Sequence, residues 1–369
     1  MAPQLNSQSS SLLTINLDAI ADNYKFLERE VSPAQLAAVV KANAYGLGVE
    51  RIAASLNNLG CNTFFVATLE EGLQLRRILP QVGIHVFNGV LPGWPDEMIQ
   101  FELQPVLNSL EQVDIWLKRT ENLIKPLWAD LHVDTGMSRL GLSAEEAIQF
   151  LETPALSKAI NLDVLLSHLA IANIPEHNMN MDQLKKFKML RTKFNPTRGS
   201  LAASSGIFLG SAYHFDLVRS GIALYGGNPV PGQPNPMKKA VKLQGRILQV
   251  RSVDTPQTVG YGASHQVSGP ARIATVSTGY ADGYPRSLGN IGKVWIGDHE
   301  APVVGHISMD LTTVDVSKIP ERLARMGALV DFIGPAQSID LIASTAETID
   351  YEMLTRLGTR VQRDYVGGN

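Results

Sequence analysis

The sequence predicts an α/β fold, an N-terminal (β/α)8 TIM-type barrel followed by a mainly β C-terminal domain. Two observations in the first 226 residues predict the barrel. Eight short, nearly continuous apolar runs fit the strands of a parallel sheet that is buried on both faces, and segments with helical periodicity lie between them. A third observation, alternating strand-like sequence after a proline-rich stretch, predicts the second domain.

The apolar runs and the helical segments alternate along the chain. Apolar residues recur at helical spacing in Leu17–Leu27, Leu69–Leu79 and Leu184–Phe194, so each segment has one face to bury. Eight strand–helix units closed on themselves form a barrel of about 250 residues. The expected strands are Leu36–Val40, Thr63–Ala67, Ile84–Phe87, Gln104–Leu107, Leu127–Val133, Asp163–Leu166, Ser200–Ala203 and Leu217–Leu224.

A linker is expected at Asn228–Met237, where four prolines and a glycine exclude both periodicities. Beyond it, Val241–Val250 and Lys293–Ile296 show the alternation of strands in an antiparallel sheet. We therefore expect residues 12–237 to form the barrel domain and residues 238–369 to form the β domain.

Composition excludes several classes of protein. Hydrophobic residues make up 44% of the chain and charged residues 18%, which is ordinary for a folded protein. A net charge of −3 provides no field that would favour nucleic acid or anionic lipid. The single cysteine, Cys61, excludes an intrachain disulfide, and Met1–Ser11 lacks a secretory signal pattern. We expect a cytoplasmic protein with neither nucleic-acid nor membrane partners.

The reactive groups of a barrel come from the carboxyl ends of its strands. Lys41 directly follows a fully apolar strand, where desolvation favours the neutral amine. A neutral lysine can attack a carbonyl or hold an imine, although a solvated lysine at a strand end fits the same pattern. The residues that follow the expected strands, or lie within the last one, are Lys41, Thr68, Asn88, Asn108, Asp134, His168, Ser204, Ser205 and Arg219.

Two Ser/Gly segments, Ser204–Gly206 and Ser220–Ile222, occur after the seventh and within the eighth expected strand. Barrels commonly bind a phosphate group there, using hydroxyls and backbone N–H groups. Ser/Gly turns are common, so this pattern alone is weak. A lysine suited to an imine together with a phosphate site suggests pyridoxal 5'-phosphate.

Other chemistries have little support in the sequence. It contains none of the usual motifs for binding ATP or dinucleotides, for serine hydrolases or for zinc proteases, and we expect no metal site. Asp130 and Asp134 would face the same way on a strand and could serve a two-carboxylate hydrolase. Structural ion pairing is the more common role for such residues.

Several long motifs in the same order resemble the bacterial alanine racemases, and the resemblance covers essentially the whole chain. The segment from Val39 to Gly48, which includes Lys41, is similar to the pyridoxal-lysine signature of that family. The other matching segments are Val133–Gly141, Val218–Gly226, Gly260–Gly262, Thr278–Gly283, Ser308–Asp310 and Ile349–Glu352.

The resemblance implies a barrel with a C-terminal β domain and a head-to-tail homodimer with shared active sites. Lys41 would hold the cofactor as an imine and act as one catalytic base, and Tyr261 from the other subunit would be the second base. Racemisation needs one group on each face of the substrate carbon. Without the resemblance, Tyr261 would be interpreted as a core aromatic between two glycines.

The resemblance also implies binding residues for the cofactor and the substrate. Arg219 would face the pyridine nitrogen, keep it unprotonated and so favour proton return over transamination. Taken alone, Arg219 suits a salt bridge, Arg139 a surface charge, and Tyr280 and Tyr351 packing. The implied cofactor-binding residues are Lys41, Tyr45, His168, Ser204, Ser205, Arg219, Gly221, Ile222 and Tyr351, and those for the substrate are Arg139, Met309 through its backbone N–H, and Tyr280 at the entrance.

Four positions depart from the family pattern. His132 replaces a lysine that is carbamylated in many members and orients the substrate-binding arginine, and an imidazole cannot supply the carbamate's negative charge. Leu47 stands where histidine is usual, Ser204 where asparagine is common, and His306 where arginine usually precedes the Ser-Met-Asp motif. These changes affect neither expected base, but they put the positioning of Arg139 in question.

The sequence therefore predicts an isomerase that interconverts L- and D-alanine and supplies D-alanine for peptidoglycan. One alternative is a racemase of broader specificity that acts on serine and other small amino acids, because His132 and Leu47 alter positions near the pocket. Another is a protein that binds pyridoxal phosphate without racemase turnover. The sequence does not rank the substrates, decide between a biosynthetic and a catabolic role, or give the strength of the dimer.

Overall fold

The computed structural model describes residues 9–120 and 127–368. These residues form two compact units, each built around its own eight-stranded sheet. The first unit comprises Ala21–Leu224 and Asn228–Met237, and the second comprises the residues up to Ile20, Tyr225–Gly227 and the residues from Lys238 on. Asn228–Met237 contains no helix or strand, as its prolines predict.

The first unit is a (β/α)8 barrel, which confirms the predicted fold class. Its eight parallel strands follow the order β8-β7-β6-β5-β4-β3-β2-β9, and a parallel bridge between Ala203 and Arg219 closes the circle. The strands are β2 (Gln35–Val39), β3 (Thr63–Val66), β4 (Gly83–Val86), β5 (Leu103–Leu107), β6 (Leu127–His132), β7 (Ile160–Leu166), β8 (Arg198–Ser200) and β9 (Leu217–Ser220).

The eight expected strands are all present, with differences at their ends. β9 is shorter than the expected Leu217–Leu224, because a 3-10 helix over Ile222–Tyr225 follows Gly221. β8 begins and ends earlier than predicted and leaves Leu201–Ala203 as a loop. In both cases apolar residues continue past the strand because the loop itself is buried.

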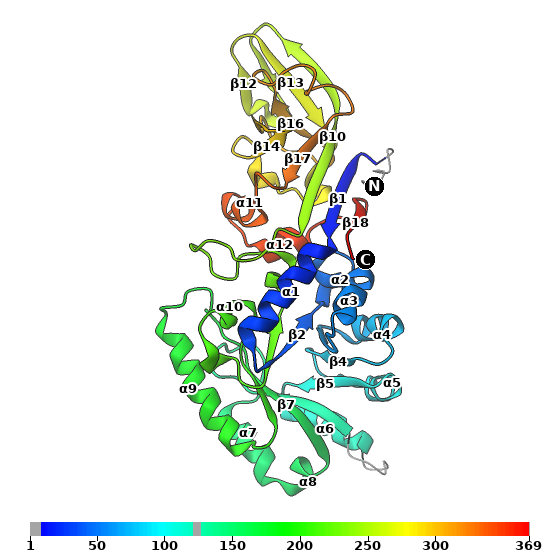
Figure 1. Ribbon diagram of the computed structural model, residues 1–369, viewed down its shortest axis with the longest axis vertical. Coiled ribbons are helices and arrows are strands. Elements are labelled where there is room, and N and C mark those ends of the chain that lie inside the picture. The colour runs from blue at the N-terminus through cyan, green and yellow to red at the C-terminus, as the bar shows by residue number, and fades with distance from the viewer. Residues whose placement is uncertain (1–8, 121–126, 369) are drawn as a thin grey trace. The chain divides into compact units, whose positions relative to one another are not determined.

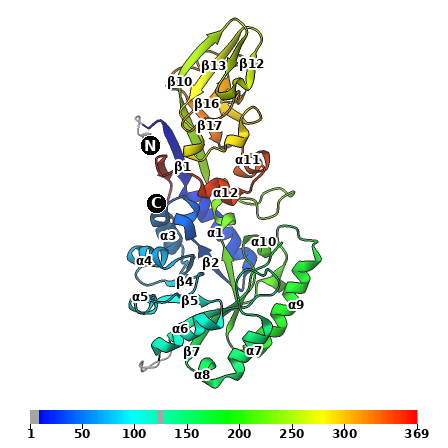
Figure 2. The ribbon, with the colours of Figure 1, turned by 180° about the vertical axis from the view of Figure 1, so that it is seen from behind.

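Helices surround the barrel strands, with α4 and α9 on opposite sides in both ribbon views (Figures 1 and 2). The longer helices bury an apolar face; α3, for example, buries Val49, Ile52, Ala53 and Leu56. The helices are α1 (Leu17–Val31), α2 (Lys41–Tyr45), α3 (Val49–Asn58), α4 (Leu69–Ile78), α5 (Pro95–Gln100), α6 (Leu110–Thr120), α7 (Ala144–Glu152), α8 (Pro154–Ser157), α9 (Asn178–Lys193) and α10 (Ser204–Ile207).

The second unit is mainly β, as predicted, and its long strand β10 pairs antiparallel with β1, β13 and β17. Two short helices, α11 (Ile339–Thr345) and α12 (Asp350–Thr355), precede its last strand. The strands are β1 (Ser11–Asn16), β10 (Val241–Val253), β11 (Gln257–Val259), β12 (His265–Val267), β13 (Ala271–Val276), β14 (Lys293–Ile296), β15 (His299–Pro302), β16 (Thr312–Asp315), β17 (Leu329–Ile333) and β18 (Gln362–Val366).

The first strand differs from the expected organisation. β1 pairs with β10 and β18 and so belongs to the β unit, whereas the sequence places residues from 12 onward in the barrel domain. Leu13 and Ile15 are fully buried there. Apolar residues at this spacing would fit a strand of either sheet, so only tertiary pairing decides which sheet β1 joins.

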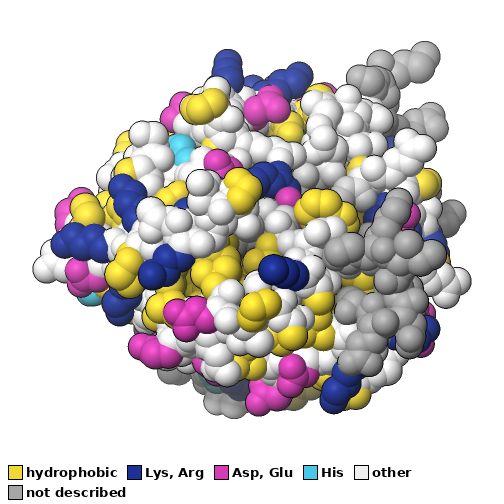
Figure 3. All heavy atoms as spheres, turned by 90° about the horizontal axis from the view of Figure 1, so that it is seen from below, with side chains coloured by type: hydrophobic (Ala, Val, Ile, Leu, Met, Phe, Trp, Pro, Cys, Tyr) yellow, Lys and Arg dark blue, Asp and Glu magenta, His cyan; other side chains and the backbone are white. Residues whose placement is uncertain are grey.

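Figure 3 shows one face of the molecule, on which basic, acidic and hydrophobic side chains are interspersed. The visible part of that face therefore carries no extended patch of a single charge. Within residues 9–120 and 127–368, no helix combines the length and the apolar character that a membrane crossing requires.

Candidate active site

The carboxyl ends of the barrel strands carry most of the predicted site residues. Lys41 follows β2, His168 follows β7, and Ser204 and Ser205 begin α10 after β8. Arg219 lies in β9, two residues before Gly221. Because the strands are parallel, these residues lie at the same end of the barrel.

Lys41 begins a backbone turn that L-amino acids normally avoid. The four residues after it, Ala42, Asn43, Ala44 and Tyr45, all have left-handed φ angles between 52° and 55°. Each such residue costs about 1–2 kcal/mol without compensating contacts. The turn is closed by hydrogen bonds that include Ala44 N–H to Val40 O at 2.8 Å and Gly46 N–H to Ala42 O at 2.7 Å. Strain concentrated beside a reactive group is typical of functional sites.

Glu71 on α4 holds this turn against the next strand. Its Oε1 accepts the Ala42 N–H at 2.6 Å, and its Oε2 accepts the Ala67 N–H at 2.7 Å. This role of Glu71 is not among those predicted from the sequence. Thr68 and Glu71 have the spacing of a helix cap, and Thr68 does accept the Glu71 N–H. Only the tertiary fold brings Ala42 within reach of the carboxylate.

The environment of Lys41 favours its neutral form. Burial lowers the pKa of the Lys41 amine, and the positive charge of Arg139 lowers it further, against a smaller opposite effect of Glu71. The Lys41 Nζ lies 5.8 Å from the centre of the Phe87 ring. An amine that loses its proton readily can act as a nucleophile or a base near neutral pH.

Arg219 is buried inside the barrel, with 2% of its surface exposed. Its Nη1 donates to Ser200 O at 2.9 Å and also to the Ser200 hydroxyl, and its Nη2 donates to Ser167 O at 2.5 Å. Burial lowers the pKa of Arg219 to about 10, although the charge of Asp130 opposes this. The guanidinium therefore stays charged at neutral pH and is oriented by neutral oxygens.

Two histidines near the strand ends are neutral. Burial is the main cause that lowers the pKa of His132 to about 4 and that of His168 to about 3, and Arg219 contributes to both. His132 Nδ1 lies 2.7 Å from Asn108 Oδ1. The Asn108 amide nitrogen already donates to Phe87 O and Val106 O, so its oxygen must accept from His132. His132 Nε2 is then an unprotonated acceptor.

The predicted phosphate-binding segments lie close together but have different tasks. The Ser204 hydroxyl accepts the N–H groups of Gly221 and Ala223 at 3.0 and 3.3 Å, so it holds the loop after β9. At Gly221 a Cβ atom would lie only 2.2 Å from the Tyr45 hydroxyl. Glycine is therefore required for Tyr45 to approach this loop. Ser205 follows Ser204 in the sequence, and Ile222 follows Gly221.

The remaining predicted residues belong to the β unit. Tyr261 is 74% exposed and lies between Gly260 and Gly262, which both have positive φ angles. The alternative interpretation of Tyr261 as a core aromatic is therefore wrong. Met309, Tyr280 and Tyr351 are also exposed. Arg139, in the barrel unit, is exposed as well.

The two carboxylates of the hydrolase alternative do not form one site. β6 ends at His132, so Asp134 lies beyond the strand, where its carboxylate accepts the N–H groups of residues 136–138. Asp130 is buried and bonded to His85 at 2.6 Å and Gln104 at 2.5 Å. His85, Asp130 and Asp163 lie close enough to share a metal ion, but protein donors already engage both carboxylates.

The chain thus combines a closed barrel with a second, mainly β unit, and a lysine lies on a strained turn at the barrel mouth. These features indicate a barrel enzyme with an added β domain. The family model of the alanine racemase N-terminal domain matches residues 15–229, and that of the C-terminal domain matches residues 240–365. The chain therefore belongs to the alanine racemase family and is an isomerase.

Individual relatives extend over nearly the whole chain. The alanine racemase of Rhodospirillum rubrum is 48% identical over 362 residues, which cover 98% of this chain and 97% of that protein. The catabolic alanine racemase of Agrobacterium fabrum is 44% identical over 359 residues, covering 97% and 92%.

Solved structures of alanine racemases are similar to this chain over nearly its whole length. The Bartonella henselae alanine racemase with covalently bound pyridoxal phosphate has a TM-score of 0.93 and 41% identity, covering 97% of this chain and 100% of that chain. The biosynthetic alanine racemase of Pseudomonas aeruginosa has a TM-score of 0.90 and 33% identity, covering 98% and 100%.

Replacing Glu71 with Ala removes two hydrogen bonds between a carboxylate and backbone N–H groups. Such bonds stabilise by about 1.5–3 kcal/mol each, so we expect the free energy of unfolding to fall by roughly 3–6 kcal/mol. Glu71→Gln keeps one acceptor oxygen and should lose about half as much. Urea denaturation of the cofactor-free protein measures both. Equal losses for Glu71→Ala and for Glu70→Ala, which alters an exposed neighbour, would contradict the role of Glu71.

The lowered pKa of His132 predicts a pH dependence of stability. The folded protein keeps His132 neutral down to about pH 4, whereas the unfolded chain takes up the proton near pH 6.5. Stability contributed by this site is therefore lost as the pH falls from 6.5 toward 4. We expect His132→Gln to lose less stability than the parent across this range, and His299→Gln, at an exposed site, to behave like the parent. Denaturant titrations at several pH values test this, and identical profiles for all three proteins would refute it.

Proposed function

We propose that this protein is a pyridoxal-phosphate-dependent racemase that interconverts L- and D-alanine by proton transfer at Cα. The observation that carries the proposal is Lys41, a lysine with a lowered pKa on a left-handed turn at the barrel mouth. Membership of the alanine racemase family supports the same function.

The residues around the barrel mouth fit pyridoxal 5'-phosphate. Gly221 leaves space that a Cβ would fill, and the Tyr45 hydroxyl lies against it. Tyr45, Ser205, Gly221 and Ile222 would bind the phosphate with hydroxyl and backbone groups, with Ser204 fixing the loop. The wider proposed set adds Lys41, which would hold the cofactor, His168 beside the ring, Arg219 at the ring nitrogen, and Tyr351 at the phosphate.

The proposed reaction uses one proton-transfer group on each face of the amino acid. When bound, pyridoxal phosphate would make the Cα–H of the amino acid more acidic, because its conjugated ring withdraws electrons from that carbon. The Lys41 amine takes or returns the proton on one face, and the phenol of the partner subunit's Tyr261 does so on the other. Arg219 has no acceptor atom and stays charged, so it cannot protonate the ring nitrogen in the manner of a carboxylic acid.

Substrate binding is assigned to three further residues. The exposed guanidinium of Arg139 and the backbone N–H of Met309 would hold the carboxylate, and Tyr280 would line the entrance. His132 Nε2 is an uncharged acceptor through which Arg139 could be oriented without a negatively charged partner. This arrangement would differ from the carbamylated lysine of many family members, because it would orient Arg139 through a neutral acceptor.

The assembly and the cellular role are part of the same proposal. We propose a head-to-tail homodimer in which the barrel unit holds the cofactor and the β unit contributes the second base to the partner's site. The exposed position of Tyr261 supports this, because a buried tyrosine could not reach another subunit. The enzyme would act in the cytoplasm and supply D-alanine for peptidoglycan.

A racemase of broader specificity is the second candidate. Leu47 is fully buried next to the lysine turn, and His132 is neutral, so both departures change the pocket in chemical character. Rates with serine and other small amino acids, measured beside alanine, separate the two candidates.

The first experiment follows conversion of L-alanine to D-alanine by protein supplied with pyridoxal phosphate, with an absorbance scan of the same sample. We expect conversion and a visible band from lysine-bound cofactor. A band without conversion would instead indicate a cofactor-binding protein. The absence of both would overturn the cofactor assignment.

Lys41→Met should remove the absorbance band and lower turnover by at least about 10²–10⁴-fold. The cofactor-free variant should be as stable as the parent or more stable at neutral pH. The reason is that the folded pKa of Lys41 lies below its unfolded value of 10.5, so this half-buried amine opposes folding at pH values below 10.5, and most strongly below its folded pKa. Thermal denaturation and absorbance measure the two effects, and a less stable variant would contradict the burial argument.

Tyr261→Phe should retain the cofactor band and lower racemisation by about 10²–10⁴-fold in both directions. Proton exchange at Cα in heavy water should persist on the face served by Lys41. NMR of the recovered alanine measures that exchange. Full activity of Tyr261→Phe with both enantiomers would refute the two-base assignment.

A further inference from the structure

Two turns of the β unit are laid directly against each other. Ser308–Leu311 forms one turn, closed by the Ser308 N–H to Leu311 O at 2.9 Å and by the Leu311 N–H to the Ser308 hydroxyl at 3.1 Å. The other turn begins at Gly279, and its Tyr280 and Ala281 N–H groups donate to Ser308 O and Met309 O at 3.1 and 3.0 Å.

Glycine at position 279 is required for this contact. A Cβ atom there would lie 2.4 Å from the carbonyl oxygens of both Ser308 and Met309. Any side chain would push the two turns apart. The relative position of Tyr280 and Met309, both exposed, is thus fixed by backbone contacts.

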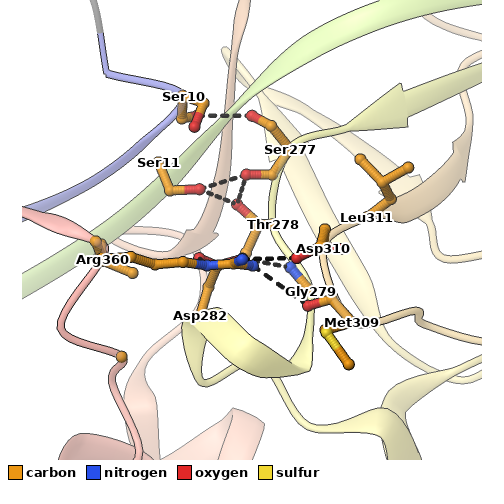
Figure 4. A network of polar contacts seen from close by, with 12 residues as sticks. Ser10, Ser11, Ser277, Thr278, Gly279, Asp282, Met309, Asp310, Leu311 and Arg360 are labelled. Carbon is orange, nitrogen blue, oxygen red and sulfur yellow. Dashed lines mark hydrogen bonds and ion pairs between the residues drawn. The ribbon is translucent and has the colours of Figure 1, made fainter.

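Arg360, between α12 and β18, bonds both turns at once (Figure 4). Its Nε and Nη2 donate to the two oxygens of Asp282 at 2.8 and 2.9 Å. Its Nη1 donates to Asp310 at 2.6 Å, and its Nη2 also reaches Met309 O at 3.4 Å. A planar guanidinium with five N–H groups can make this set of bonds, whereas a lysine cannot.

The two carboxylates differ in what they need from Arg360. The Asp282 side chain is 4% exposed and also accepts the Gly279 N–H, so Arg360 neutralises a buried charge there. The Asp310 side chain is 57% exposed and would be well solvated without a partner. Its bond to Arg360 is therefore not needed to compensate burial, and its clear effect is to tie down the tip of the Ser308–Leu311 turn.

The orientation of the Met309 peptide follows from these bonds. Its carbonyl oxygen accepts from Ala281 and Arg360. Its N–H makes no hydrogen bond with any residue that the structure describes, and the residue is exposed. The peptide thus presents a free donor outward from a turn held on its inner side.

We propose that Arg360 is a positioning residue that, through Asp282 and Asp310 together, fixes the Met309 N–H beside Tyr280 so that it can receive the carboxylate of the substrate. This inference rests on the proposed function in one respect, the binding of the substrate carboxylate by Met309. It adds the Arg360 clamp, by which we mean the hydrogen bonds from Arg360 to Asp282 and Asp310. The clamp affects substrate binding only by holding the two turns in place.

Asp310→Ala is the sharpest variant, because it leaves the pair with buried Asp282 intact and should fold normally. We expect the KM for alanine to rise about five- to tenfold, as for a loosened carboxylate contact, with kcat within about twofold of the parent. Asp310→Asn keeps an oxygen acceptor and should recover most of the parental KM. The inhibition constant of acetate should rise in parallel with KM.

Arg360→Lys tests the other side of the clamp. It retains a positive charge for Asp282 but cannot reach three acceptors in fixed directions. We expect the same rise in KM as for Asp310→Ala, and little further change when the two substitutions are combined. The matched control is Arg251→Gln, since Arg251 is exposed and bonds only the neighbouring Gln249 side chain among the described residues.

Hydrogen exchange of the cofactor-free protein provides a readout that does not depend on activity. The amides of Tyr280, Ala281 and Leu311 should exchange faster in Asp310→Ala and Arg360→Lys than in the parent, and unchanged in Arg251→Gln. If the parent lacks racemase activity while exchange responds as expected, the proposed function fails but the clamp stands. An active parent whose KM and exchange are both unchanged by Asp310→Ala would overturn the inference.

Discussion

The left-handed turn that begins at Lys41 is the constraint on which the barrel site depends. Four successive non-glycine residues adopt a conformation that L-amino acids disfavour, so the turn persists only because its surroundings hold it. Glu71 binds its first N–H, and Asn43 accepts the Val49 N–H at its far end. The turn sets the direction of Lys41 at its start and the position of Tyr45 at its end, where the hydroxyl passes over Gly221.

Positive charge is the second feature that organises the barrel mouth. The positive charge of Arg139 lowers the pKa of Lys41, and Arg219 lies buried inside the barrel, where the charge of Asp130 favours its protonated form. Together with burial, Arg219 and Arg139 keep His132 and His168 neutral. The histidines can then donate or accept hydrogen bonds without adding further charge. Such a site suits ligands with anionic groups, and a phosphate and a carboxylate are the groups that the proposed cofactor and substrate bring.

In the β unit, the residues assigned to the site are exposed, and their positions are fixed by the backbone around them. Tyr261 lies between two glycines with positive φ angles, and Met309 lies on a turn packed against Gly279. Exposed side chains on loops gain little from burial. Their order comes from hydrogen bonds among backbone groups and from a buried carboxylate such as Asp282, which also fixes the chain around it.

Much of the fold could be predicted because buried strands and helix faces require apolar residues at a characteristic spacing in the sequence. Most barrel strands appear as apolar runs, although β8, Arg198–Ser200, is polar and only the loop after it is apolar. The positions of Lys41, His168 and Arg219 at strand ends follow from counting along those runs. The residues at which the strands end could not be predicted in the same way. Strand β9 stops at Ser220 although apolar residues continue, and Asp134 lies past the end of β6. A buried loop and a buried strand have the same composition, so their boundary depends on hydrogen bonding that composition does not encode.

The sequence by itself determined the barrel, the β unit, the place of Lys41 at the end of a barrel strand and the family resemblance, because these rest on periodicity and on residues adjacent in the chain. Only the tertiary structure decided that β1 joins the β sheet, that Glu71 holds the Lys41 turn, that Asn108 fixes the tautomer of His132, and that Arg360 bonds both Asp282 and Asp310. Each of these joins residues that are distant in sequence or brought close by a turn. The physical reason is that a hydrogen bond requires a distance and a direction, and folding alone sets both.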